Sequence, residues 1–153
     1  MDLLLQQDFK EFLALLNSEK IEYLLVGGYA VSFHGYARPT GDLDVWVAIH
    51  PDTAAKMADA LVKFGFATAG ATKDMFLIPG RIVRMGVPPV RIEVMNSISG
   101  VEFAACHARR VDAVIDGVAV SIIGRDDLMA NKLAAGRAKD LNDLKHLRQS
   151  GKP

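Results

Sequence analysis

Two aspartates, Asp42 and Asp44, stand two residues apart in an otherwise apolar run that continues to Ile49. Side chains at alternate positions of a strand point to the same face, so both carboxylates project together while Leu43 and Val45 enter the core. Two ionised carboxylates this close repel one another, and a cation between them removes the repulsion. Because Mg²⁺ prefers carboxylate oxygens together with substrate phosphates, the pair predicts half of a metal–phosphate site.

A third carboxylate, Glu93, lies in the later run Val90–Met95, whose aliphatic side chains alternate with Arg91 and Glu93. If the two strands are neighbours, three acids meet in one site. The alternative is an ordinary ion pair between Glu93 and Arg91 on a solvated face, which is common for a glutamate on a half-exposed strand. Taken together with the aspartate pair, we interpret Glu93 as a functional residue.

Two glycines, Gly27 and Gly28, precede the aspartates and directly follow the apolar run 21–26. Paired glycines mostly mark turns, so this pair alone says little about function. The chain has neither a GxGxxG nor a GxxxxGK[ST] motif, so the dinucleotide-binding and P-loop interpretations lack their glycines. In the loop that follows, Arg38 is placed to contact a phosphate and Thr40 to brace the turn, although most loop arginines are simply exposed.

Length and composition restrict the class of protein. A chain of 153 residues fits a single domain, 1–153, in which we expect a catalytic part of sheet and helices over 1–123 and a helical part over 124–153. The formal net charge of zero argues against bulk electrostatic binding to nucleic acid. With Cys106 as its only cysteine the chain forms no internal disulfide, and we expect a reducing, cytoplasmic location. Neither a signal peptide nor a membrane-spanning run is recognisable.

Hydrophobic periodicity predicts a chain in which helices and strands are mixed. The expected helices are 2–18, 29–34, 51–65, 101–108, 124–135 and 139–147, and the expected strands are 21–26, 42–49, 82–85, 90–95, 110–115 and 118–123. Residues 67–80 have no clear period and are interpreted as a strand or edge segment. The predicted fold class is therefore α+β, with helices packed on a mixed central sheet that is not uniformly parallel, plus C-terminal helices.

In this order and spacing the residues resemble the nucleotidyltransferase superfamily that includes DNA polymerase beta. Its pattern is an apolar strand, a Gly-Gly or Gly-Ser pair, a [DE]-x-[DE] motif and a third acid on a later strand; residues 23–47 match it closely and 90–95 more loosely. Segments 128–132 and 137–144 look like the lysine motif and the D-x-x-D motif of the AbiEii-like nucleotidyltransferase toxins and their minimal relatives. One departure is Gly28, where many members have a serine whose hydroxyl would touch the triphosphate.

The resemblance implies transfer of a nucleoside monophosphate from an NTP to a hydroxyl on RNA, protein or a small molecule. It also implies Mg²⁺ (or Mn²⁺) as the cofactor and a cognate toxin or antitoxin as a partner, with no membrane involved. The implied metal ligands, which are also the catalytic residues, are Asp42, Asp44 and Glu93. The implied nucleotide-binding residues are Gly27, Gly28, Arg38, Thr40, Lys132 and Arg137, with Asp140 and Asp143 in support.

The downstream motifs leave two alternatives open. Lys132 either neutralises the triphosphate or is a solvated lysine on the surface of a helix. Asp140 and Asp143 share one helix face, where they either orient Lys132 or Arg137, or pair with nearby lysines such as Lys139 and with water.

Two rival functions differ in class from the preferred one. The first is a catalytically silent module that binds a partner, and the presence of all three acids argues against it. The second is a metal-dependent phosphohydrolase. Such enzymes usually add histidine ligands, and the four histidines of this chain do not have metal-ligand spacing.

Overall fold

Six strands and six α-helices are present in the part of the chain that this computed structural model describes, residues 4–65, 72–87 and 89–150. The strands are β1 (Tyr23–Val26), β2 (Asp42–Val47), β3 (Ile82–Val87), β4 (Val90–Met95), β5 (Val111–Ile115) and β6 (Val118–Ile122). The helices are α1 (Gln7–Ser18), α2 (Gly27–Phe33), α3 (Pro51–Lys63), α4 (Phe103–Ala108), α5 (Arg125–Ala135) and α6 (Ala138–Ser150), and a short 3-10 helix, η1, spans Met75–Leu77.

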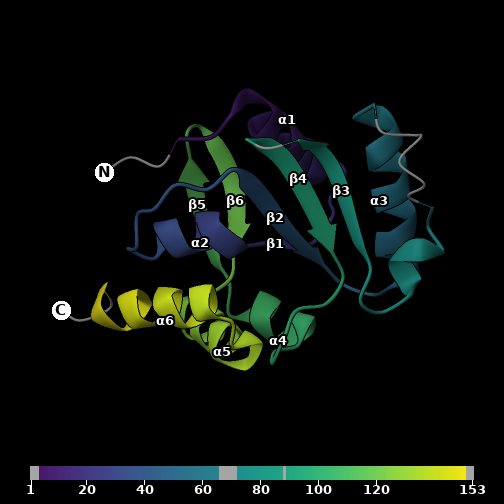
Figure 1. Cartoon of the computed structure of the whole chain (residues 1–153). Helices are drawn as coiled ribbons and strands as arrows, with labels where there is room; N and C mark the ends of the chain where they lie inside the picture. Colours follow the sequence, from purple (N-terminus) through teal and green to yellow (C-terminus); the bar gives the residue numbers. More distant parts are fainter. Residues whose placement is uncertain (1–3, 66–71, 88, 151–153) are drawn as a thin grey trace.

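The strands form one mixed sheet in the order β3-β4-β2-β1-β6-β5 (Figure 1). The β2–β4 and β1–β6 pairs are parallel, whereas the other three pairs are antiparallel. The predicted α+β fold with a sheet that is not uniformly parallel is therefore confirmed. The predicted hairpin at residues 116–117 is also confirmed, since β5 and β6 pair across it.

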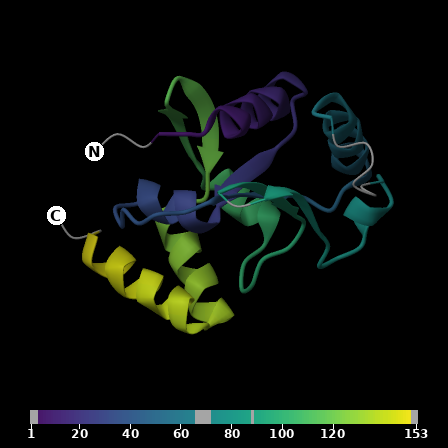
Figure 2. The ribbon, with the colours of Figure 1, turned by 45° about the horizontal axis from the view of Figure 1, so that its top comes forward.

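The core lies between the sheet and the helices. All four residues of β1 are buried, as are the residues of β2 that alternate with its two aspartates. Helix α1 presents Phe9, Phe12, Leu13 and Leu16 at helical spacing, and all four side chains are fully buried. At the other end of the chain α5 and α6 lie side by side, as both Figure 1 and Figure 2 show. This helical pair faces the end of the sheet where β1 runs into α2.

One predicted element is wrong. Part of the expected strand or edge segment at 67–80 lies outside the described residues, but within it residues 75–77 form η1 and no strand. Successive amide groups donate to carbonyl oxygens three residues earlier, from Leu77 to Asp74 and from Ile78 to Met75. These bonds use the donors that a sheet ladder would need. The buried Phe76 side chain anchors the turn in the core.

The other differences are shifts of element ends by a few residues, which is usual for helix and strand termini. Helix α2 begins at Gly27, two residues earlier than expected, and α6 continues to Ser150. No helix within the described residues has both the length and the apolar character needed to span a membrane.

Candidate active site

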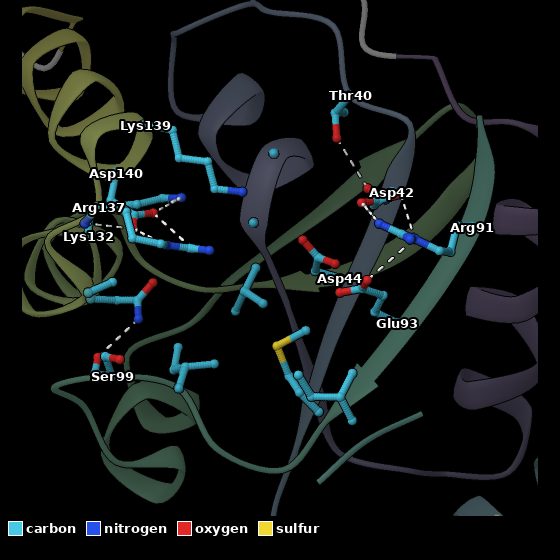
Figure 3. A pocket seen from close by; sticks show the side chains of 18 of the residues that line it. Thr40, Asp42, Asp44, Arg91, Glu93, Ser99, Lys132, Arg137, Lys139 and Asp140 are labelled. Atoms are coloured by element: carbon cyan, nitrogen blue, oxygen red, sulfur yellow. Dashed lines mark hydrogen bonds and ion pairs between the residues drawn. The ribbon is translucent and has the colours of Figure 1, made fainter. Parts of the chain in front are cut away.

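The register of β2 and β4 brings the three acids to one face of the sheet. Asp44 lies opposite Glu93 and Asp42 lies opposite Arg91 in this parallel pair. Paired residues of neighbouring strands point the same way, so the acids project together into one pocket (Figure 3). The pocket has a volume of about 640 Å³, a size typical of small-molecule sites. The structure therefore brings the three acids together, while their role as metal ligands stays a prediction.

Asp44 is the least compensated of the three acids. Its Oδ1 atom is buried and has no hydrogen-bond partner among the described residues. Burial, followed by the negative charges of Glu93 and Asp42, raises the pKa of Asp44 to about 7. An ordinary aspartate is fully ionised at neutral pH, whereas the ionised form of Asp44 is disfavoured. A nearby cation would stabilise that ionised form.

The other two acids are bound to arginines. The Nε and Nη2 atoms of Arg91 donate to the two carboxylate oxygens of Asp42 at 3.1 and 2.9 Å, and Nε lies 3.4 Å from Oε1 of Glu93. Arg84 donates a further hydrogen bond to Glu93 at 3.1 Å. The ion pair between Glu93 and Arg91 that the sequence left as an alternative is therefore present, but it lies inside the pocket beside Asp44. No group of three or more His, Cys, Asp or Glu side chains in the described part of the chain is arranged to hold a metal ion.

Gly27 makes room for the Asp44 carboxylate. Val26 pairs with Asp44 across β1 and β2, so the next residue along the chain passes close to the acid. A Cβ atom on Gly27 would lie 2.0 Å from Oδ2 of Asp44, and its φ of +66° is itself unfavourable for other residues. The glycine therefore allows the chain to pass from β1 into α2 directly beside Asp44.

Gly28 is explained by Thr40. A Cβ atom on Gly28 would lie 2.5 Å from the Thr40 hydroxyl, so the threonine side chain fills the space that a residue larger than glycine would need. The same hydroxyl donates to the carbonyl oxygen of Asp42 at 3.3 Å, which confirms the prediction that Thr40 braces the turn. The departure from the serine that many related proteins carry thus coincides with a hydroxyl supplied from the neighbouring loop.

A buried charge cluster, consisting of Lys132, Asp140 and Asp143, lies beside the acids. The ammonium group of Lys132 is 3.3 Å from Oδ1 of Asp140 and 3.1 Å from Oδ2 of Asp143. Lys132 is only 6% exposed and the two aspartates 1% and 2%. The alternative of a solvated lysine is therefore wrong, and so is that of solvated aspartates. The alternative in which the aspartates orient Lys132 is confirmed.

Two arginines of the pocket wall are fixed by this cluster. Arg38 makes two hydrogen bonds of 2.9 Å to Asp143, and the Nε atom of Arg137 donates to Asp140 at 2.7 Å. Burial alone would raise the pKa of each aspartate, but these arginines and Lys132 hold both pKa values below the usual range. Helix α6 is thereby tied to the loop that leads into β2, and Arg38 is not the freely exposed loop residue that its position suggested.

Lys139 and an apolar surface are the parts of the pocket that the sequence did not reveal. Lys139 lines the pocket and forms no ion pair with another described residue, and Figure 3 shows its side chain extending from α6 toward the centre of the pocket. Sequence reasoning treated it as a partner of helix acids, because only the packing of α6 decides which way it points. The pocket is also lined by Ile82, Met95 and Ile98, which we call the apolar wall.

Comparisons with known proteins identify the family and the fold of the chain. A sequence model of the family described as "Nucleotidyltransferase of unknown function (DUF6036)" matches residues 4–150. No curated protein matches the chain. Among solved structures, an antigenic nucleotidyltransferase-like protein from Paracoccidioides brasiliensis is 19% identical with a TM-score of 0.57, over 94% of this chain and 75% of that one.

Two further structures share the fold. The lincosamide antibiotic adenylyltransferase LnuA, solved with lincomycin bound, is 15% identical with a TM-score of 0.56, over 96% of this chain and 98% of its own. A candidate nucleotidyltransferase from Thermotoga maritima is 10% identical with a TM-score of 0.57, over 92% and 90%. At such identities the structures establish the fold, and the family match rests on the sequence.

Proposed function

The chain belongs to the nucleotidyltransferase family DUF6036, and we propose that it transfers a nucleoside monophosphate from an NTP to an acceptor hydroxyl in the pocket around Asp44. The observation that carries the proposal is the state of Asp44, whose buried Oδ1 has no partner although two more acids lie beside it. A protein without a cationic ligand gains nothing from this arrangement, since it lowers stability.

The proposed cofactor is Mg²⁺ or Mn²⁺, held by Asp42, Asp44 and Glu93. The donor set fits, because it consists of hard carboxylate oxygens on adjacent strands, one of which has no partner. In this proposal Asp42 would be free to hold the ion only without its ion pair to Arg91. When bound, the ion would stabilise the negative charge on the transferring nucleotidyl group and would lower the pKa of the attacking hydroxyl.

The chain's own residues bind and orient the nucleotide. Backbone N–H groups near Gly27 and Gly28 donate hydrogen bonds to phosphate oxygens, which can approach closely because glycine has no side chain. The positive side of the pocket adds the side chains of Arg38, Thr40, Lys132, Arg137 and Lys139. The acceptor oxygen forms a bond to the α-phosphorus as the bond to pyrophosphate breaks, and Glu93 takes the acceptor's proton.

The finer identity is part of the same proposal. The lysine motif with Lys132 and the D-x-x-D motif with Asp140 and Asp143 support a place among the AbiEii-like and minimal nucleotidyltransferases, and with it a role in a toxin–antitoxin pair. Cys106, which is buried and unpaired, supports a cytoplasmic location.

The test is transfer of label from [α-³²P]NTPs in the presence of Mg²⁺ or Mn²⁺ to RNA, protein or metabolites. We expect one of these pools to become labelled by the wild-type protein and not by Asp44→Ala. The matched control is Asp52→Ala, which removes an exposed aspartate at the start of α3, outside the pocket. Equal labelling by Asp44→Ala would refute the mechanism. Binding of a protein partner without any nucleotide chemistry would instead support the silent-module rival.

A further inference from the structure

The pocket has two chemically different ends. Its polar end holds the glycines of α2, the loop with Thr40 and the cations of α5 and α6. The apolar wall of Ile82, Met95 and Ile98 also lines the pocket, and the sheet places Ile82 and Met95 next to Glu93. The polar end accounts for an NTP, but the apolar wall has no role in the reaction as proposed so far.

The strand register places the apolar wall next to the acids. One row across the sheet reads Val26, Asp44, Glu93 and Arg84, from β1 through β2 and β4 to β3. Met95 lies two residues after Glu93 on the same face, and its partner on β3 is Ile82. Glu93 therefore stands at the boundary between charged and aliphatic surface.

The direction of the reaction assigns the apolar wall to the acceptor. In an in-line displacement the attacking hydroxyl and the leaving pyrophosphate lie on opposite sides of the α-phosphorus. The phosphate-binding groups lie on the β1 and α2 side of Asp44, which places the pyrophosphate there. The hydroxyl then approaches from the side of Glu93 and β3, where Ile82 and Met95 are partly exposed.

The lining does not have the features that recognise RNA. Single-stranded RNA is held by aromatic side chains that stack on its bases and by a basic track along its backbone. No aromatic side chain is among the described residues that line the pocket. Of its six basic side chains, all but Lys139 form ion pairs with acids of the described chain. Aliphatic walls with a few polar groups are instead typical of small-molecule sites.

We propose that the acceptor is a small hydroxylated molecule that lays an apolar face on Ile82, Met95 and Ile98 and directs its hydroxyl to Glu93. This inference rests on the proposed nucleotidyl transfer and adds the class of its acceptor. Ser97, Ser99 and Asn131 also line the pocket, and the two serine hydroxyls offer hydrogen bonds to further polar groups of such a molecule.

The first arm of the test identifies the acceptor pool. The purified chain is incubated with Mg²⁺ and [α-³²P]NTPs and with three pools from one cell extract: filtered metabolites, RNA and protein. We expect label in the metabolite pool. Label confined to RNA or to protein would overturn the inference but leave nucleotidyl transfer intact, and no label in any pool would refute the proposed function itself.

The second arm locates the acceptor in the pocket. Ile82→Ser and Ile98→Ser are expected to raise the metabolite concentration needed for half-maximal labelling by about tenfold or more, as for lost apolar contacts in a substrate pocket. ATP affinity, measured by calorimetry without acceptor, is expected to stay within about twofold of wild type. The matched control is Val87→Ser, which changes a 75% exposed valine on β3 outside the pocket. If the Ile82 and Ile98 variants lost affinity for ATP by as large a factor as for the metabolite, the assignment would be overturned, because the apolar wall would then hold the nucleoside.

Discussion

Asp44 and Asp140 line the same pocket, yet their carboxylates are in opposite electrostatic states. Asp44 has a buried oxygen without a partner, and burial together with Glu93 and Asp42 raises its pKa to about 7. Burial opposes ionisation of Asp140 as well, but hydrogen bonds from Arg137 and the charge of Lys132 bring its pKa below the usual value. The same residue type thus has an unpartnered buried oxygen at position 44 and is fully paired at position 140.

The difference separates the part of the pocket in which a bound cation would stabilise the protein from the part that stabilises the structure of the pocket. A carboxylate that already has its cations stabilises the folded protein and has little to offer a metal ion. A carboxylate that is held among other acids destabilises the protein until a cation arrives. On this basis Asp44 is the acid that a cation would stabilise, whereas Asp42 and Glu93 would first have to exchange their arginine partners for it. The buried charge cluster positions Arg38 and Arg137 around the pocket.

The largest expected effect comes from Asp44→Asn, which removes the uncompensated acid. Transfer should fall by roughly 10³-fold, since a bound metal contributes several kcal/mol to the transition state. The free energy of unfolding of Asp44→Asn should instead be higher than that of the wild type at neutral pH. Because the folded pKa lies above the unfolded one, ionisation of Asp44 lowers stability as pH rises from about 4 to about 7.

Urea unfolding at pH 5 and pH 8 with a chelator measures this second effect. Between these two pH values the wild type should lose roughly 2 to 3 kcal/mol more than Asp44→Asn. Asp52→Asn, an exposed aspartate on α3, is the control and should follow the wild type. If the unfolding free energies of Asp44→Asn and the wild type show the same pH dependence, the pKa of Asp44 is not raised in the folded protein.

The paired side of the comparison should respond in stability. Asp143→Asn leaves Lys132 and Arg38 short of an acid, and breaking a buried pair in this way costs about 3 kcal/mol of unfolding free energy. The pKa of Asp143 is lowered in the fold, so its stabilising effect is present above about pH 4 and is lost as the pH falls further. Denaturant unfolding at pH 7 and pH 3 measures both.

The control for this variant is Asp126→Asn, at an aspartate on α5 whose side chain is 97% exposed. It should change the unfolding free energy by about 0.5 kcal/mol or less. A loss in Asp143→Asn no larger than that of Asp126→Asn would show that the buried charge cluster does not hold the helices on the sheet.

A smaller effect is expected from Lys139→Ala. Lys139 forms no ion pair with a described residue, so its removal should leave stability unchanged while it weakens ATP binding about tenfold through loss of one charge-assisted hydrogen bond. Calorimetric titration with ATP measures the affinity. Lys145→Ala, on the same helix but outside the pocket, serves as the control. Equal affinities for the two variants would place the phosphates elsewhere.

The smallest effect is expected from Arg91→Ala. Without this guanidinium Asp42 and Glu93 are free of a competing cation, so Mn²⁺ should bind severalfold more tightly, as followed by electron paramagnetic resonance of the free ion. Arg110→Ala, which breaks an ion pair with Asp112 away from the pocket, should leave Mn²⁺ affinity as it is. Weaker Mn²⁺ binding in Arg91→Ala would mean that the arginine supports the metal site instead of competing with it.

Local sequence patterns were sufficient for the six strands and six α-helices, though not for η1, and for the placement of the three acids. Alternation in β2 and β4 placed Asp42, Asp44 and Glu93 on outward faces, and the parallel register then made them neighbours. What local patterns could not provide was the partner of each charge. Lys132 is buried because α6 covers it, and residue spacing alone gives the same pattern for a buried lysine and a solvated one.

The remaining differences also depend on contacts between distant segments. Gly28 was predicted only as a site without a hydroxyl, and the reason for the glycine lies in Thr40, which the fold brings against it. The apolar wall joins β3, β4 and the loop after β4, and no single stretch of sequence identifies it. In η1 the hydrogen bonds within the turn outweighed any tendency of 75–77 to form a strand.

The fate of two labels shows whether the pocket around Asp44 transfers a nucleoside monophosphate. The wild-type protein is incubated with Mg²⁺ and one acceptor pool, with NTP labelled either at the α- or at the γ-phosphorus. We expect α-label to enter the acceptor and γ-label to leave as pyrophosphate, both with the wild-type protein and neither with Asp44→Asn. Transfer of γ-label to the acceptor, or its release as inorganic phosphate, would contradict this expectation.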